Sequence, residues 1–197
     1  MNSLKILRDE CLSCRKCEIG GVMVEGNFVS NVFSNMNPDA RIMVVGQNPG
    51  SREVEEGEPF VGPSGAFFDR AVNEILGMSR SDFYVSNVVR CYTPNNRPPH
   101  LSEKDNCRYF LDREIAILNP KVIVALGAPA FKQLTGLSGI MKHCGEMIFS
   151  PRYGVYVMPL LHPSPRNTND RGRRELFYDG LRRLKKVLDE NEVGGSA

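Results

Sequence analysis

Four short apolar runs, separated by segments with helical periodicity, constrain the fold of this chain more than any other feature. The runs lie at 41–46, 82–89, 121–127 and 154–161. The helical segments lie at 64–76, at 102–119, around 130–134 and at 171–190. An alternation of buried strands and helices is typical of a parallel sheet that carries helices on both faces. The sequence therefore predicts an α/β fold.

The size and composition of the chain fit one domain. With 197 residues, of which 41% are hydrophobic, the chain can bury a large core without disulfide support. We expect a single domain over residues 1–190 and a disordered tail at 191–197. No apolar run approaches about eighteen residues, and the N-terminus lacks the apolar stretch of a secretory signal. These features predict a cytoplasmic protein without a membrane partner.

Six cysteines are spread along the chain, and four of them form a spaced set. In a reducing compartment such cysteines are more typical of metal ligands than of disulfides. The set consists of a C-x-x-C pair and two distant residues: Cys14, Cys17, Cys91 and Cys107. Four thiolates satisfy either a [4Fe–4S] cluster or a tetrahedral zinc ion, and the residues alone favour neither. Cys11 is an alternative to Cys14 as a ligand, and Cys144 is interpreted as a spare thiol.

The charge pattern places any nucleic-acid contact on a local basic surface. The net charge is only +2, although Lys and Arg gather between residues 166 and 186. We interpret most of that run as the solvent-exposed face of a terminal helix. Arg90 and Arg97, after the second apolar run, fit either phosphate contacts or ordinary surface charges.

Three polar motifs follow three of the four predicted strands. They are GQNPG at 46–50, SNVVRC at 86–91 and HPSPR at 162–166. Ligands of open α/β sheets bind beyond the carboxyl ends of the strands. We therefore expect the three motifs to meet at one edge of the sheet and to form the functional site there.

These motifs, together with EGEPFVGPSG at 56–65 and the four cysteines, resemble the uracil-DNA glycosylase superfamily. The similarity is greatest to its iron–sulfur branch, family four, and extends from about Cys14 to about Arg183. It implies a three-layer α/β/α sandwich around a four-stranded parallel sheet, a [4Fe–4S] cluster and hydrolysis of the bond between a base and deoxyribose. The catalytic loop departs from family four at Gln47 and Asn48, where the N-P-G form resembles the mismatch-specific and single-strand-selective branches.

The resemblance assigns roles around the base. Asn48 would orient the attacking water, with Gln47 beside it, and His162 would donate a hydrogen bond to the leaving base. The amide of Asn87 offers an acceptor and a donor side by side, which match N3–H and O4 of uracil and mismatch cytosine. Phe60 would stack on the flipped base. Each side chain taken singly also fits a structural role, and their convergence favours the functional one.

Two further sets of residues complete the predicted site. Gly50 leaves the pocket wall near C5 of the base open, and Glu53 is the candidate that fills this space. The expected DNA contacts are a helix start and the loop after His162, namely Ser64, Gly65, Ser164, Pro165 and Arg166.

The sequence thus predicts a monomeric, monofunctional glycosylase that removes uracil from DNA during base excision repair and leaves an abasic site. No lysine lies in the three motifs, so no Schiff base is expected. A glycosylase for a modified pyrimidine, in repair or in restriction of foreign DNA, is the first alternative. A non-enzymatic binder of damaged or single-stranded DNA is the second. A third alternative is a covalent crosslinking relative, which uses a histidine in an inserted basic loop near the region of Cys91 and Cys107. His100 is the only histidine there and the basic insertion is absent, so this alternative fits less well.

Overall fold

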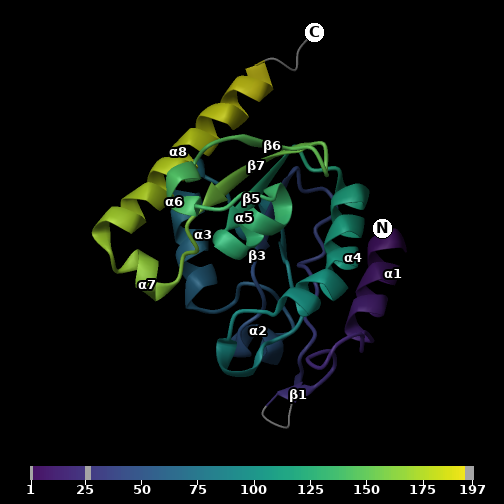
Figure 1. Cartoon of the computed structure of the whole chain (residues 1–197). Coiled ribbons are helices and arrows are strands. Elements are labelled where there is room, and N and C mark those ends of the chain that lie inside the picture. The colour runs from purple at the N-terminus through teal and green to yellow at the C-terminus, as the bar shows by residue number, and fades with distance from the viewer. Residues whose placement is uncertain (1, 25–27, 194–197) are drawn as a thin grey trace.

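The computed structural model describes residues 2–24 and 28–193, which build a mostly parallel sheet between two helical layers (Figure 1). The sheet has the order β4-β3-β5-β7-β6. Its strands are β3 (Ile42–Gly46), β4 (Phe83–Asn87), β5 (Val122–Leu126), β6 (Ile148–Ser150) and β7 (Val155–Leu160). β4, β3, β5 and β7 run parallel, whereas β6 pairs antiparallel with β7. A separate short ribbon pairs β1 (Met23–Val24) with β2 (Phe28–Val29).

Helices cover both faces of the sheet because alternate strand residues point to opposite sides. Ile42 and Val44 of β3 face α3 (Pro63–Leu76) and α8 (Arg171–Val193). Met43 and Val45 face the layer of α1 (Asn2–Leu12), α4 (Leu101–Leu118) and α5 (Ala128–Thr135). All residues of β3, β4 and β5 are buried, as expected for parallel strands that are covered on both faces.

Shorter helices occupy the connections at the carboxyl edge of the sheet and beside it. They are α2 (Ser51–Glu56), α6 (Ile140–His143), α7 (Pro165–Thr168) and the 3₁₀ turns η1 (Arg80–Asp82) and η2 (Pro94–Asn96). α2 and η2 follow β3 and β4, and α7 follows β7, so these three elements lie close to the predicted site.

The α/β architecture and the four parallel strands are confirmed, but the count of four strands is wrong. β6 adds a fifth, antiparallel strand at the edge of the sheet. α8 continues to Val193, and the rest of the predicted tail, 194–197, lies outside the described residues. Within 2–24 and 28–193, no helix is long and apolar enough to cross a membrane.

Arg90 lies in the core. Both sequence-based interpretations of this residue, a phosphate contact and an ordinary surface charge, are therefore wrong. Its side chain is 1% exposed and forms an ion pair with Glu114 at 2.5 Å. Glu114 also accepts hydrogen bonds from Tyr84 (2.9 Å) and Ser86 (2.8 Å). A buried carboxylate on α4 therefore compensates the charge, which no local sequence pattern reveals.

Candidate active site

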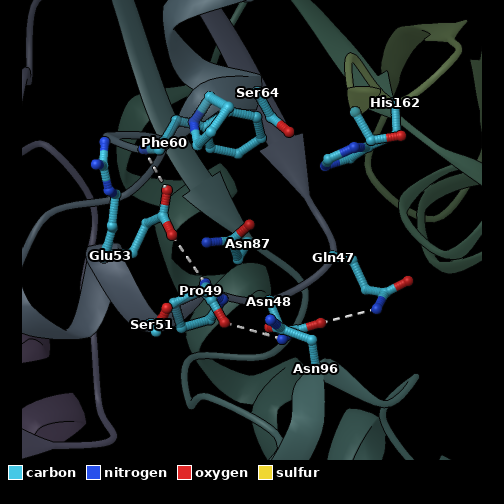
Figure 2. A pocket seen from close by; sticks show the side chains of 15 residues that line it. Gln47, Asn48, Pro49, Ser51, Glu53, Phe60, Ser64, Asn87, Asn96 and His162 are labelled. Atoms are coloured by element: carbon cyan, nitrogen blue, oxygen red, sulfur yellow. Dashed lines mark hydrogen bonds between the residues drawn. The ribbon is translucent and has the colours of Figure 1, made fainter. Parts of the chain in front are cut away.

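A cavity of about 480 Å³ opens at the carboxyl edge of the parallel strands, where the three polar motifs meet. In Figure 2, Phe60, Asn87 and His162 face this space from three different segments. Nine of the predicted site residues line it: Gln47, Asn48, Gly50, Glu53, Phe60, Ser64, Asn87, His162 and Ser164. The expectation that the motifs converge at one sheet edge is therefore confirmed.

Asn87 is the last residue of β4 and presents an unused hydrogen-bond acceptor to the cavity. Its side chain is buried, yet Oδ1 has no hydrogen-bond partner in the described part of the chain. Such an orphaned buried group costs free energy unless a ligand satisfies it. Gly46 allows this placement, because a Cβ there would lie 2.5 Å from Oδ1 of Asn87 and 2.6 Å from the ring of Phe60. The arrangement fits an amide whose hydrogen-bond partner is a bound base.

Phe60 reaches the cavity from a strained backbone. Its φ is +61°, a left-handed conformation that phenylalanine rarely adopts and that is common at functional sites. Arg80 of η1 holds the segment, since its guanidinium donates to the carbonyl of Phe60 at 2.6 Å and to that of Pro59 at 3.1 Å. An ion pair of 2.8 Å with Asp69 fixes Arg80 in turn.

His162 follows β7 and faces Phe60, with the two ring centroids 6.1 Å apart. Burial lowers the pKa of the imidazole below its usual value, and the nearby charge of Glu53 opposes that effect. The carbonyl of His162 accepts hydrogen bonds from the amide of Ser164 and from the side chain of Asn167, both at 2.8 Å. The backbone of His162 is therefore held by its own loop, and the lowered pKa keeps the imidazole neutral at pH 7.

Asn48 and Gln47 form one hydrogen-bonded unit. Nε2 of Gln47 donates to Oδ1 of Asn48 at 2.8 Å, and Nδ2 of Asn48 donates to the carbonyl of Pro49 at 3.0 Å (Figure 2). Thr93 accepts a longer bond from the same nitrogen, 3.3 Å. The amide of Asn48 is thus oriented from both ends, and Gln47 contributes to this orientation.

Glu53 fills the space beside Gly50 and joins two helix starts. Oε2 accepts from the amide of Gly50 at 3.0 Å, and Oε1 accepts from the amide of Gly62 at 2.8 Å (Figure 2). A Cβ on Gly50 would lie only 2.7 Å from Oε2. A larger residue at position 50 would therefore displace this carboxylate as well as narrow the cavity.

Comparison with known proteins identifies the family of this fold and cavity. The family model described as Uracil DNA glycosylase superfamily matches residues 33–185. The chain belongs to the uracil-DNA glycosylase superfamily. A Type-4 uracil-DNA glycosylase from Sulfurisphaera tokodaii is 36% identical over 198 residues, covering 96% of this chain and 85% of the relative. One from Saccharolobus solfataricus is 34% identical over 201 residues, covering 98% and 90%.

A solved structure supports the fold. The solution structure of a protein from Methanosarcina acetivorans matches with a TM-score of 0.52 and 12% identity, covering 79% of this chain and 98% of that one. At such low identity the likeness concerns the fold alone. The superfamily resemblance inferred from the motifs is confirmed by the sequence relatives, as is its similarity to the type-4 branch.

Only some of the residues predicted to contact DNA line the active-site cavity. Ser64 and Ser164 line it, whereas Pro165 and Arg166 are exposed on α7 just outside. Gly65 is buried, and a Cβ there would collide with the carbonyl oxygen of Phe60. Because Gly65 has no side chain, the Phe60 segment packs on α3. Only the backbone amide of Gly65 is left for the predicted phosphate contact.

The four predicted ligand cysteines share one neighbourhood but do not form a closed metal site. All six cysteines are free. Among the described residues, no group of three or more His, Cys, Asp or Glu side chains is gathered tightly enough to hold a metal ion. Burial raises the pKa of Cys91 and Cys107, and nearby Cys17 raises both further. The mutual effect shows that these thiols lie near one another, as the donors of one cluster must. The raised pKa means that they are protonated unless a bound cation draws out the thiolate form.

The segment that carries the N-terminal cysteines is tied to the strand region of Cys91. Asn31 forms a bridge with Cys91, and its side chain donates to the carbonyl of Cys11 at 2.8 Å. A Cβ on Gly20 would approach the carbonyl oxygens of Cys14 and Cys17 to 3.1 and 3.2 Å. The loop is thus folded closely around this glycine. Burial also raises the pKa of Cys11 to about 12, and this residue packs on the cluster of Leu7, Phe33 and Phe110.

Several residues of the site were not predicted. The cavity also includes Pro49, Ser51, Arg52, Gly62, Pro63 and Asn96. They lie within or beside the recognised motifs, so a broader reading of the two Pro- and Gly-rich segments would have found most of them. Arg80 and Asn31 act on backbone carbonyls from distant parts of the chain, and no spacing pattern reveals such contacts.

Proposed function

We propose that this chain is a monomeric uracil-DNA glycosylase that hydrolyses the N-glycosidic bond of deoxyuridine in DNA and leaves an abasic site. The observation that carries the proposal is the buried, unpartnered Oδ1 of Asn87 in a cavity shared with Phe60 and His162. The type-4 relatives are named for this activity, which supports the assignment.

In the proposed reaction the base is flipped into the cavity and read by Asn87. Oδ1 accepts from N3–H of uracil and the amide nitrogen donates to O4, whereas cytosine presents the opposite pattern. Phe60 contributes a stacking surface. Rejection of the mismatched base follows because its polar groups and those of Asn87 would remain buried and unpaired.

Bond cleavage requires stabilisation of separated charge. The electron pair of the C1′–N bond moves onto the base, and the water oxygen then bonds to C1′. That water loses a proton, and the base takes one up. A neutral His162 donates a hydrogen bond to the developing anion of the base and keeps its own proton. Gln47 occupies one lone pair of Asn48 Oδ1, so the other accepts from the attacking water and sets its direction.

We also propose that Cys14, Cys17, Cys91 and Cys107 hold a [4Fe–4S] cluster, with zinc as the alternative occupant. The type-4 name of the relatives and the shared neighbourhood of the thiols support this assignment. When bound, the cluster would supply a covalent cross-link between the N-terminal segment, the loop after β4 and α4. No step of base release depends on it.

DNA contacts would surround the cavity. Ser64 at the start of α3 and Ser164 in the loop after His162 line the cavity and would bind phosphates. Pro165 and Arg166 on the exposed α7 would enter the space left by the flipped nucleotide. Without a lysine in the three motifs, the product would be an intact strand with an abasic site.

The test is base release from oligonucleotides that contain uracil, 5-hydroxymethyluracil, hypoxanthine, thymine or cytosine at one position. We expect release of uracil and none of thymine or cytosine. Tight binding of damaged DNA without release of any base would instead show a non-enzymatic binder.

A second candidate, a glycosylase for polar 5-substituted uracils, rests on Gly50 and Glu53. The carboxylate beside Gly50 would reject a methyl group, since its own hydration would be lost without compensation. A 5-hydroxymethyl group could donate to it. Release of 5-hydroxymethyluracil faster than uracil would favour this candidate over the first.

A further inference from the structure

A second cavity, of about 380 Å³, lies between α4 and α5 and is lined by four cationic side chains. They are Lys104, Arg108, Lys132 and Arg152. We propose that this cavity, the α4–α5 groove, binds the phosphate backbone of a DNA strand that extends beyond the active-site edge. This inference rests on the proposed function, because DNA is the substrate there.

The cations of the groove are only partly neutralised. Arg108 pairs with Asp105 at 2.8 Å and Arg152 with Asp112 at 2.6 Å, and both pairs are partly exposed. Lys104 and Lys132 form no ion pair within the described residues. In a chain with a net charge of only +2, two uncompensated lysines facing one hollow are a concentrated positive field.

Arg108, which lines the groove, has one side-chain nitrogen without an acceptor. Nε of Arg108 is buried and has no hydrogen-bond partner among residues 2–24 and 28–193. A buried N–H of a guanidinium without an acceptor is costly, and a phosphate oxygen is the acceptor that guanidinium groups match best. The rest of the wall combines apolar side chains with uncharged polar ones and contributes no carboxylate; it consists of Leu101, Pro129, Gln133, Leu134, Thr135, Gly136, Ser150 and Pro151.

The groove begins where the active site ends. Leu101 and Pro129 lie in the first turns of α4 and α5, and both helices start at the carboxyl edge (Figure 1). Gly127, just before α5, backs His162, since a Cβ on it would lie 3.2 Å from Cβ of His162. On the other side, Asn96 lines the active-site cavity, and its neighbour Arg97 pairs with Glu103 of α4 at 2.5 Å.

The length of the groove suits a strand better than a single ion. Leu101 and Arg108 are seven residues apart on α4, about 10 Å at 1.5 Å per residue. Phosphates of one strand follow at about 3.4 Å along the duplex axis, so about three would lie beside this stretch. A free nucleotide or inorganic phosphate would use the same chemistry, and the experiment below separates these sources from DNA.

The test compares Lys104→Glu/Lys132→Glu with a matched control, Lys185→Glu/Lys186→Glu, on the exposed face of α8 in the opposite layer. Affinity for a fluorescent, uracil-free duplex of about three helical turns is measured against salt concentration. We expect the groove variant to lose roughly 10- to 100-fold in affinity at low salt and to flatten the salt slope by about two. The control should keep the slope of the unmodified protein.

Two outcomes would overturn the proposal. One is an unchanged salt slope in a groove variant whose thermal unfolding matches that of the control. The other is binding of inorganic phosphate or ATP that the groove mutations abolish while the DNA slope stays the same. Because this DNA carries no uracil, failure of the groove and failure of base excision are separate results.

Discussion

At the scale of single residues, the unpartnered amide of Asn87 makes the sharpest prediction. In Asn87→Asp a carboxylate replaces the amide, so neither the donor to O4 nor a neutral acceptor for N3–H remains. We expect the single-turnover rate on uracil to fall by about 10²-fold or more, while affinity for undamaged DNA stays nearly constant, since phosphate contacts do not read the base.

A matched substitution isolates this effect. Asn73→Asp makes the same change at an exposed position of α3 and should leave both the excision rate and the binding affinity unaltered. Uracil excision by Asn87→Asp at the unmodified rate, with selectivity over cytosine retained, would show that another group reads the base.

The ionisation of His162 gives a second prediction at this scale. Burial lowers the pKa of the folded imidazole below about 6.5, the usual value. A neutral ring is the proposed donor, so activity should persist as pH falls through 6.5 and decline only near the lower folded value. The same depressed pKa contributes to stability above the unfolded value, and this contribution is lost as pH falls from about 6.5 toward the folded pKa.

The pKa can be measured directly by NMR titration of labelled histidine, with His162→Gln used to assign the signal. Single-turnover rates across the same pH range should show an acid limb that His162→Gln no longer shows. A titration of His162 at or above its usual value would refute both the buried neutral ring and its proposed role.

At the scale of elements, η1 controls the segment that carries Phe60. Arg80 binds two carbonyls of a strained turn and pairs with Asp69 of α3, so it acts as a positioning residue. Arg80→Ala should release the turn and lower the excision rate at saturating DNA by roughly 10-fold or more. Affinity for undamaged DNA should not change, which a general loss of folding could not explain.

Two comparisons sharpen this test. Arg80→Lys keeps the ion pair but cannot bind both carbonyls as a planar fork, so it should recover only part of the rate. Arg70→Ala removes an exposed arginine of the same helix layer and should behave like the unmodified protein. Equal rates for Arg80→Ala and Arg70→Ala would mean that Phe60 keeps its conformation without Arg80.

The strands that the sequence predicted are continuous apolar runs, whereas β6 and α2, which it missed, carry no such pattern. β3, β4 and β5 are apolar runs buried on both faces, and α4 begins and ends at clear signals. β6 has only three residues, one of them exposed, and so carries little periodic signal. α2 is a single polar helix between glycines, where composition favours a loop, although its ends are fixed by Glu53 and Gly57.

At the scale of the whole molecule, the site was predictable because the sheet topology determines where the loops that carry the motifs lie. Parallel strands deliver their following loops to one edge, so three short motifs were enough to anticipate a common cavity. What topology does not determine is pairing between distant polar side chains. Arg90 was misplaced for that reason, since its partner Glu114 lies on α4, and Gln47 proved to contact Asn48 directly.

The proposed cluster is the remaining feature of this scale, because it would join three separate parts of the chain. Cys17→Ser should abolish iron binding and lower the melting temperature, whereas Cys144→Ser, beside α8 and remote from the set, should do neither. If the lost cross-link contributes about 2–5 kcal/mol, as closure of a long loop does, a domain of this size should melt roughly 5–20 °C lower. Base excision by the remaining folded Cys17→Ser protein should continue, since none of the four cysteines lines the active-site cavity. Anaerobically purified protein should contain about four irons per chain. Stoichiometric zinc without iron would show that the four cysteines bind the alternative ion. A melting temperature of Cys17→Ser equal to that of Cys144→Ser would show that no stabilising cross-link is present.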